Sequence, residues 1–108
     1  MTNRMNIGIF GSNNDSTVDG VLAEVKEAER DGFASYWQSQ IFGLDALSTL
    51  SVVGHVVPRI ELGTSVIPTY PRHPMMLAQQ ALTANQASAG RLCLGIGLSH
   101  KVVIEGML

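Results

Sequence analysis

Four short apolar runs, separated by three helical patterns, are the feature that most constrains the fold of this sequence. Successive runs begin roughly thirty residues apart, the length expected of a βα unit. Strands this apolar, with helices between them, predict a parallel sheet that is shielded by helices. Two closures of such an α/β sheet remain open: an open doubly wound sheet, or part of an eight-stranded barrel. The predicted strands span Asn6–Phe10, Ala34–Gln38, Ile60–Val66 and Arg91–Gly97.

The intervals between the runs predict three helices. In the first, apolar residues recur at helical spacing and charged residues occupy the opposite face. The predicted helices span residues 17–31, 45–57 and 73–88. The residues expected to cap or end them are Ser16 or Thr17, Gly32, Asp45, Pro58 and Gly90.

Composition restricts the partners of the chain. Its 108 residues predict a single domain, and only 15% of them are charged, below the ~25% usual for soluble domains. The formal net charge of −2 and the absence of a Lys/Arg cluster argue against nucleic acid as a partner. The sequence has neither a basic amphipathic stripe for a membrane surface nor an apolar run near the ~20 residues of a membrane span. A single cysteine, Cys93, excludes an internal disulfide and fits a reducing compartment, so a cytoplasmic location is expected.

Several familiar active-site patterns fail in this sequence. The first turn, Gly8-Ile-Phe-Gly11, does not continue as a dinucleotide-binding glycine motif, and no acid follows the second strand. Gly97-Leu-Ser99 lacks the glycine that a nucleophile elbow needs after its serine. The three histidines have no carboxylate or thiolate at ligand spacing, so no metal site is predicted. Cys93 lies within a predicted strand and is expected to be a buried, inert thiol.

The segment Arg59–Pro74 carries the strongest functional signal. It reads as a buried strand that ends in small hydroxylated residues and a proline-stiffened loop before the third helix. This end of a strand carries cofactors and substrates in repeating β/α proteins, although an ordinary connection would look similar. His100 follows the fourth strand on the same expected rim, where it could contact a ligand or be a solvated loop residue. Met75 and Met76 open the third helix and are expected to fill the core or an interface.

Taken together, these segments resemble the luciferase-like monooxygenase superfamily, and most closely its branch of oxidoreductases that use the 5-deazaflavin coenzyme F420. The resemblance covers nearly the whole chain but distinguishes F420 from FMN poorly. The segments that carry it are Asn6–Phe10, Ser35–Trp37, Leu62–Val66, Pro71–Pro74 and Gly90–Gly97.

The resemblance implies a TIM-like barrel that binds its flavin at the carboxyl ends of the strands. It also implies a non-proline cis peptide bond after the third strand, at Ser65–Val66, behind the ring. Family members usually carry an Asp-His-like pair after the second strand; this chain has Gln40-Ile41, so that acid–base role does not carry over. His100, whose imidazole would titrate near ~6.5, is the expected proton-exchanging residue. The expected cofactor-binding residues are Ser39, Gln40, Thr64, Ser65, Val66, Gly97 and Ser99.

Length sets the remaining expectations. A complete barrel takes ~250 residues, so residues 1–108 correspond to the first four strands and three helices, a truncated half-barrel. The resemblance implies hydride transfer to a small organic substrate, or monooxygenation with FMN. The alternative is a non-catalytic remnant or interaction module that needs a complementary half. Unpaired strand edges and uncovered apolar faces predict self-association or pairing with such a half.

Overall fold

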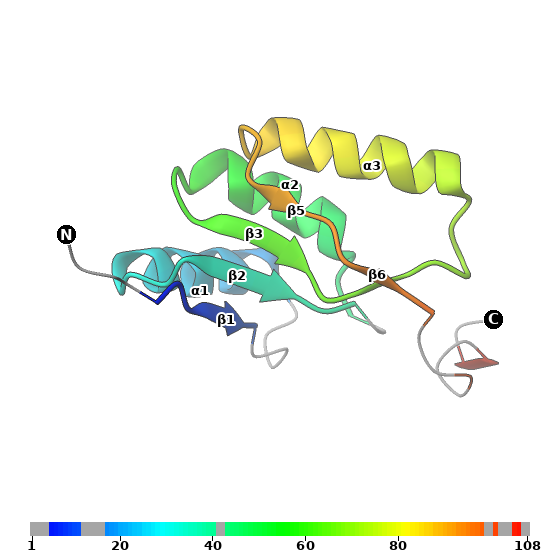
Figure 1. The fold of residues 1–108 in the computed structure, drawn as a ribbon, viewed down its shortest axis with the longest axis horizontal. Helices are drawn as coiled ribbons and strands as arrows, with labels where there is room; N and C mark the ends of the chain where they lie inside the picture. The colour runs from blue at the N-terminus through cyan, green and yellow to red at the C-terminus, as the bar shows by residue number, and fades with distance from the viewer. Residues whose placement is uncertain (1–4, 12–16, 41–42, 99–100, 102–104, 107–108) are drawn as a thin grey trace.

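The computed structural model describes residues 5–11, 17–40, 43–98, 101 and 105–106. Six parallel strand segments and three helices make up this part of the chain, and α1 and α2 lie behind the strands in Figure 1, with α3 above them. The elements in chain order are β1 (Gly8–Phe10), α1 (Val18–Arg30), β2 (Ser35–Gln38), α2 (Ala46–Val56), β3 (Glu61–Thr64), β4 (Ile67–Pro68), α3 (Pro74–Ala87), β5 (Leu92–Cys93) and β6 (Ile96–Gly97).

The main sheet has the parallel order β1-β2-β3-β5. Phe10 pairs with Trp37, Trp37 with Gly63, and Gly63 with Cys93, so these four residues form one row across the sheet. Because β1 lies at an edge of the sheet, the alternative of an open doubly wound sheet with an interior first strand is wrong. The order follows the chain, as in consecutive units of a (β/α)8 barrel, so the arc is part of such a barrel.

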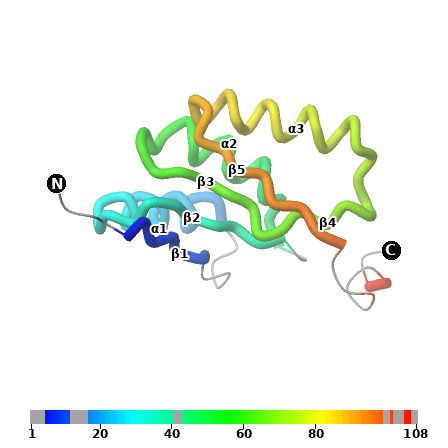
Figure 2. The backbone as a smooth tube through the Cα atoms, viewed as in Figure 1, coloured from blue at the N-terminus to red at the C-terminus, as the bar shows by residue number. Residues whose placement is uncertain are grey.

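The fourth predicted strand divides into β5 and β6, so its predicted continuity was wrong. The third ends as β3 at Thr64, two residues before its predicted end at Val66. After β3 the chain turns at Ser65, whose N–H still donates to the Gln38 carbonyl at 2.8 Å. It then resumes as β4, which pairs with β6 in a separate two-stranded sheet. The tube in Figure 2 shows the two later segments running side by side beyond the main sheet. Backbone pairing thus shifts from one sheet to the other where a single strand was expected.

The helix boundaries lie within one residue of their predicted positions, because the capping residues act locally. The Thr17 hydroxyl accepts from the Gly20 N–H, and the Asp45 carboxylate accepts from the Ser48 N–H. Gly32 and Gly90, which follow α1 and α3, have φ values of +87° and +83°. Glycine adopts this left-handed region without a steric penalty, so both residues end their helices as predicted.

The core lies between the sheet and the helices. Tyr36 and Leu62 point from the strands toward Val25 of α1 and Val53 of α2, and each of these side chains is almost fully buried. The Tyr36 hydroxyl donates to Glu24 at 2.9 Å. Burial first, and then this bond to Glu24, raises the pKa of the phenol, so Tyr36 remains a protonated donor.

Backbone groups at the amino end of the sheet are held by two charged side chains. The Arg91 guanidinium donates to the carbonyls of Ser88, Ile60, Gly54 and Val57 at 2.6–2.7 Å. On the same side, the Glu29 carboxylate accepts from the N–H groups of residues 59 and 60. In β/α barrels this end of the sheet serves stability, which leaves the opposite end for a binding site.

One prediction about side-chain burial was wrong, and another was narrowed. Cys93 is exposed, because it points to the sheet face opposite the helices while its neighbour Leu92 packs on the core. Met75 and Met76 are 64% and 49% exposed, so neither fills the core of this arc, and an interface role for them stays a prediction. Among the residues that the structure describes, no helix has both the length and the hydropathy needed to cross a membrane.

Candidate functional site

The carboxyl ends of β3 and β5 approach each other so closely that Gly95 is required between them. A Cβ on Gly95 would stand 2.1 Å from the Thr64 carbonyl oxygen. The Gly95 N–H donates to the Thr64 hydroxyl at 2.8 Å, and that hydroxyl donates back to the Gly95 carbonyl at 2.8 Å. The Thr64 side chain is 1% exposed. Its two hydrogen bonds to Gly95 take the place of backbone pairing just beyond the ends of β3 and β5. These bonds favour a structural role for the Thr64 side chain over a direct ligand contact.

A surface formed by two glycines and the Ser65–Val66 segment lies next to this junction. We call Ser65, Val66, Gly95 and Gly97 the ledge. The Val66 side chain lies over Gly97, because a Cβ on Gly97 would stand 2.8 Å from a Val66 methyl group. Val66 is 38% exposed, and Ser65 is partly exposed. The Ser65–Val66 peptide bond is cis, so this expectation from the family resemblance is confirmed.

Trp37 covers the sheet face below the ledge, a role that sequence reasoning missed. A Cβ on Gly63 would meet the benzene ring of Trp37 at 2.3 Å, and one on Gly8 would meet the indole nitrogen at 2.9 Å. That nitrogen donates to the Ser35 hydroxyl at 2.9 Å. The indole therefore lies across glycines of both neighbouring strands. The sequence alone could not indicate this role, because it depends on the strand register that pairs Trp37 with Gly63.

Ser39 and Gln40 follow β2 beside the ledge, and both are partly exposed. The Gln40 side-chain carbonyl already accepts from the Ala46 N–H at 2.9 Å, at the start of α2. The segment after β2 also brings two further polar groups to this rim, the NH₂ group of Gln40 and the hydroxyl of Ser39. The structure thus brings Ser39, Gln40 and the ledge to the same end of the sheet.

The loops that start α2 and α3 are joined by Arg72. Its guanidinium pairs with Asp45 and donates to Gln80 at 2.7 Å. Burial acts to raise the pKa of Asp45, but hydrogen bonds from Ser48 and the charge of Arg72 outweigh it and lower the pKa. The His73 ring accepts from the Met75 N–H, which makes it the cap of α3. The Pro71–Pro74 motif therefore organises helix starts in this structure.

Ser99 and His100, the remaining predicted site residues, lie outside the described residues. Within the ranges that the structure describes, no group of three or more His, Cys, Asp or Glu side chains could hold a metal ion.

Comparison with known proteins identifies the family. A sequence model of the luciferase-like monooxygenase family matches residues 5–108. A Mycobacterium tuberculosis protein named as a coenzyme F420-dependent oxidoreductase is 40% identical over 82 residues, which are 76% of this chain and 24% of that protein. A 5,10-methylenetetrahydromethanopterin reductase of Methanolobus tindarius is 32% identical over 83 residues, 76% of this chain and 26% of that enzyme.

Solved structures show the same arrangement of strands and helices. The coenzyme F420-dependent tetrahydromethanopterin reductase of Methanopyrus kandleri superposes with a TM-score of 0.85 at 25% identity, over 94% of this chain and 29% of that one. An FMN-bound type II Baeyer-Villiger monooxygenase of Pseudomonas putida superposes with a TM-score of 0.82 at 18% identity, over 96% of this chain and 32% of that one, a likeness of fold alone. The chain thus spans about a quarter to a third of the length of these relatives. It belongs to the luciferase-like monooxygenase family.

Proposed function

We propose that this chain supplies one wall of a flavin or deazaflavin site in an oxidoreductase, with coenzyme F420 as the cofactor and FMN as the alternative. The single observation that carries the proposal is the ledge, where partly exposed Ser65 and 38% exposed Val66 lie at the carboxyl ends of the strands. A flat aromatic ring needs an exposed, shallow surface to lie against, and the glycine at position 97 lets the Val66 side chain pack down onto the neighbouring strand. The residues present therefore fit such a ring.

Each part of the rim has a proposed role. Ser65, Val66 and Gly97 would border the face of the ring, and Thr64 would hold the ledge in place through Gly95. Ser39 and Gln40 would donate hydrogen bonds to a polar ring edge. Reduced F420 supplies a hydride for a small organic substrate, whereas FMN would support oxygenation. Orientation of that ring and exclusion of water from one of its faces are the contributions of this chain.

Proton transfer is assigned to the segment after β6. His100 would exchange a proton at its imidazole during hydride transfer, and Ser99 would contact the cofactor or substrate. Both roles rest on the resemblance to the family. We also propose that residues 1–108 act as a single half-barrel unit, so that turnover requires the βα units that relatives carry beyond the matched region.

Binding tests the proposal directly. Purified chain at tens of micromolar is titrated with F420 and with FMN by equilibrium dialysis, with Trp37 fluorescence as a second readout. We expect saturable binding, tighter for F420, and at least about tenfold weaker binding in Gly97→Leu, whose side chain would displace Val66 from its place on the ledge. Gly43→Ala is the matched control, because a Cβ there meets nothing within 4 Å. Absence of binding to either cofactor would instead support a non-catalytic remnant or interaction module.

A further inference from the structure

Arg72 is buried far more deeply than the other arginines that form ion pairs in the described part of the chain. Its side chain is 13% exposed, whereas those of Arg30 and Arg59 are 74% and 75% exposed. Removing a charged group from water is costly, so a buried ion pair is weak evidence for a gain in stability. Such a pair can instead fix the geometry around it, because the planar guanidinium donates hydrogen bonds in fixed directions.

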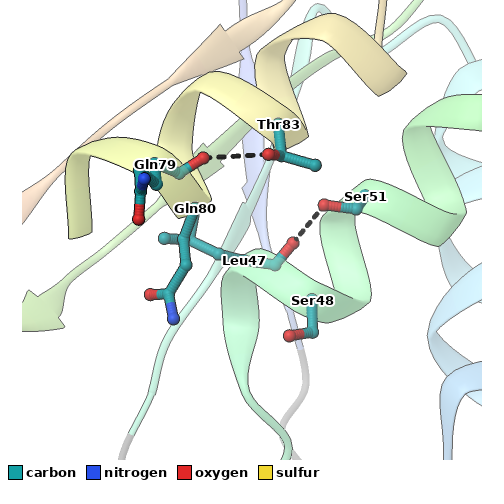
Figure 3. A pocket seen from close by; sticks show the side chains of 6 residues that line it. All are labelled: Leu47, Ser48, Ser51, Gln79, Gln80 and Thr83. Atoms are coloured by element: carbon teal, nitrogen blue, oxygen red, sulfur yellow. Dashed lines mark hydrogen bonds between the residues drawn. The ribbon is translucent and has the colours of Figure 1, made fainter. Parts of the chain in front are cut away.

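The Arg72 side chain joins the starts of two helices. Its Nη1 group donates to the Gln80 side-chain carbonyl of α3 at 2.7 Å, and its Nη2 group pairs with Oδ1 of Asp45. The second carboxylate oxygen of Asp45 accepts from the Ser48 N–H of α2 at 3.0 Å. Figure 3 shows Ser48 and Gln80 on opposite sides of a hollow of about 200 Å³ between α2 and α3. Arg72 thus connects the two helices where they begin.

The backbone before Arg72 connects it to the ledge. The Arg72 N–H donates to the Thr69 carbonyl at 3.2 Å, and the Thr69 N–H donates to the Gly97 carbonyl at 2.9 Å. Pro71 lies between Thr69 and Arg72, and its ring fixes φ, so this short turn can absorb little displacement of Arg72. A 3.2 Å bond is at the long end of the normal range, so the turn depends on the side-chain contacts of Arg72 as well. The position of the Gly97 carbonyl therefore depends on Arg72.

A second connection runs from Asp45 to the rim after β2. Ala46, the residue after Asp45 and the first of α2, donates its N–H to the Gln40 side-chain carbonyl at 2.9 Å. This bond orients the Gln40 amide, whose NH₂ group is the proposed donor to the cofactor. Because Arg72 holds Asp45, Gln40 and Gly97 are tied to the same guanidinium.

We propose that Arg72 is a positioning residue of the cofactor site. It sets the placement of the ledge, which it reaches through Thr69, relative to Gln40, which it reaches through Asp45. A flat ring that lies against the ledge and accepts a hydrogen bond from Gln40 binds well only when both groups are correctly placed. This role rests on the proposed function, but the contacts of Arg72 that carry it are present without a cofactor.

Amide signals of the ¹⁵N-labelled 108-residue chain, recorded without cofactor, test the positioning role. Arg72→Gln removes the charge and the forked donor, and Arg72→Lys keeps the charge alone. Both variants are expected to move the backbone signal of Gly97 and the side-chain NH₂ signals of Gln40. Arg59→Gln is the matched control, because it removes an ion pair with Glu29 at the amino end of the sheet and should leave these signals in place. Unchanged Gly97 and Gln40 signals in either Arg72 variant, if circular dichroism shows that it is folded, would overturn the proposal.

Cofactor affinity separates positioning from a purely stabilising role. In equilibrium dialysis of folded chains, F420 is expected to bind Arg72→Gln about tenfold more weakly than wild type, and Arg59→Gln as tightly as wild type. Asp45→Asn should weaken binding on its own but add little to Arg72→Gln, because the two side chains act as one pair. Equal affinity of Arg72→Gln and wild type would overturn the proposal. A wild-type chain that does not bind F420 would contradict the proposed function, and the signals of Gly97 and Gln40 would still decide whether Arg72 sets the geometry of the rim.

Discussion

Gly95 lies so close to Thr64 that a Cβ on Gly95 would stand 2.1 Å from the Thr64 carbonyl oxygen. The same two residues exchange two hydrogen bonds through the Thr64 hydroxyl, each 2.8 Å long. This junction fixes the point at which the strands divide and leaves the ledge beside it. Its integrity therefore matters for stability and for the proposed binding of the cofactor.

Gly95→Ala should lower the free energy of unfolding by about 1–3 kcal/mol, because the atom that it would strike is backbone and must shift. Urea unfolding followed by circular dichroism measures the change. Gly43→Ala, where a Cβ meets nothing within 4 Å, should leave the midpoint almost unchanged. Equal midpoints for Gly95→Ala and wild type would show that the strands do not approach as described.

Arg91→Lys should destabilise the chain by about 2–4 kcal/mol, since an ammonium group cannot reach four carbonyls as the guanidinium does. The exposed Arg30→Lys is the matched control and should change the free energy of unfolding by less than about 0.5 kcal/mol. Urea unfolding of the pair gives the comparison. Similar losses of unfolding free energy in both variants would show that the hydrogen bonds of the Arg91 guanidinium do not contribute specially to stability.

Asp45→Asn should cost up to about 1 kcal/mol at pH 7, because asparagine keeps the helix cap but loses the pairing with Arg72. The pKa of Asp45 is lowered in the folded state, so its charge stabilises the fold above the unfolded pKa near ~3.9. That contribution is lost as the pH falls through the folded pKa. The difference from wild type should therefore shrink toward zero in acid.

Urea unfolding between pH 7 and pH 3 checks this dependence, and exposed Glu61→Gln serves as the control carboxylate. A difference between wild type and Asp45→Asn that grows as the pH falls would contradict the sign of the effect.

Local chemistry explains which features could be predicted from the sequence. Caps such as Thr17 and Asp45 act within a few residues, so the helix boundaries followed from spacing alone. The early end of the third strand and the division of the fourth could not be predicted in this way, because both depend on the contact of Gly95 with Thr64, which lies 31 residues earlier in the chain. The exposure of Cys93 was missed for a related reason. Its run is apolar throughout, so the sequence does not indicate which sheet face a residue takes.

The candidate site was predicted in part. The resemblance correctly implied the cis bond at Ser65–Val66. It did not anticipate that the Gln40 carbonyl would bind the start of α2 or that the Thr64 hydroxyl would be used within the sheet. Trp37 was overlooked because its setting depends on glycines in the neighbouring strands, Gly8 and Gly63.

The most direct test of the proposed cofactor wall is an amide chemical-shift map of the ¹⁵N-labelled chain titrated with F420. The account predicts that the largest shifts occur at Ser65, Val66 and Gly97 and at the Trp37 indole. Amides on the outer faces of α1 and α2, such as those of Ala23 and His55, should not move. Shifts confined to other surfaces, or none at saturating cofactor, would contradict it.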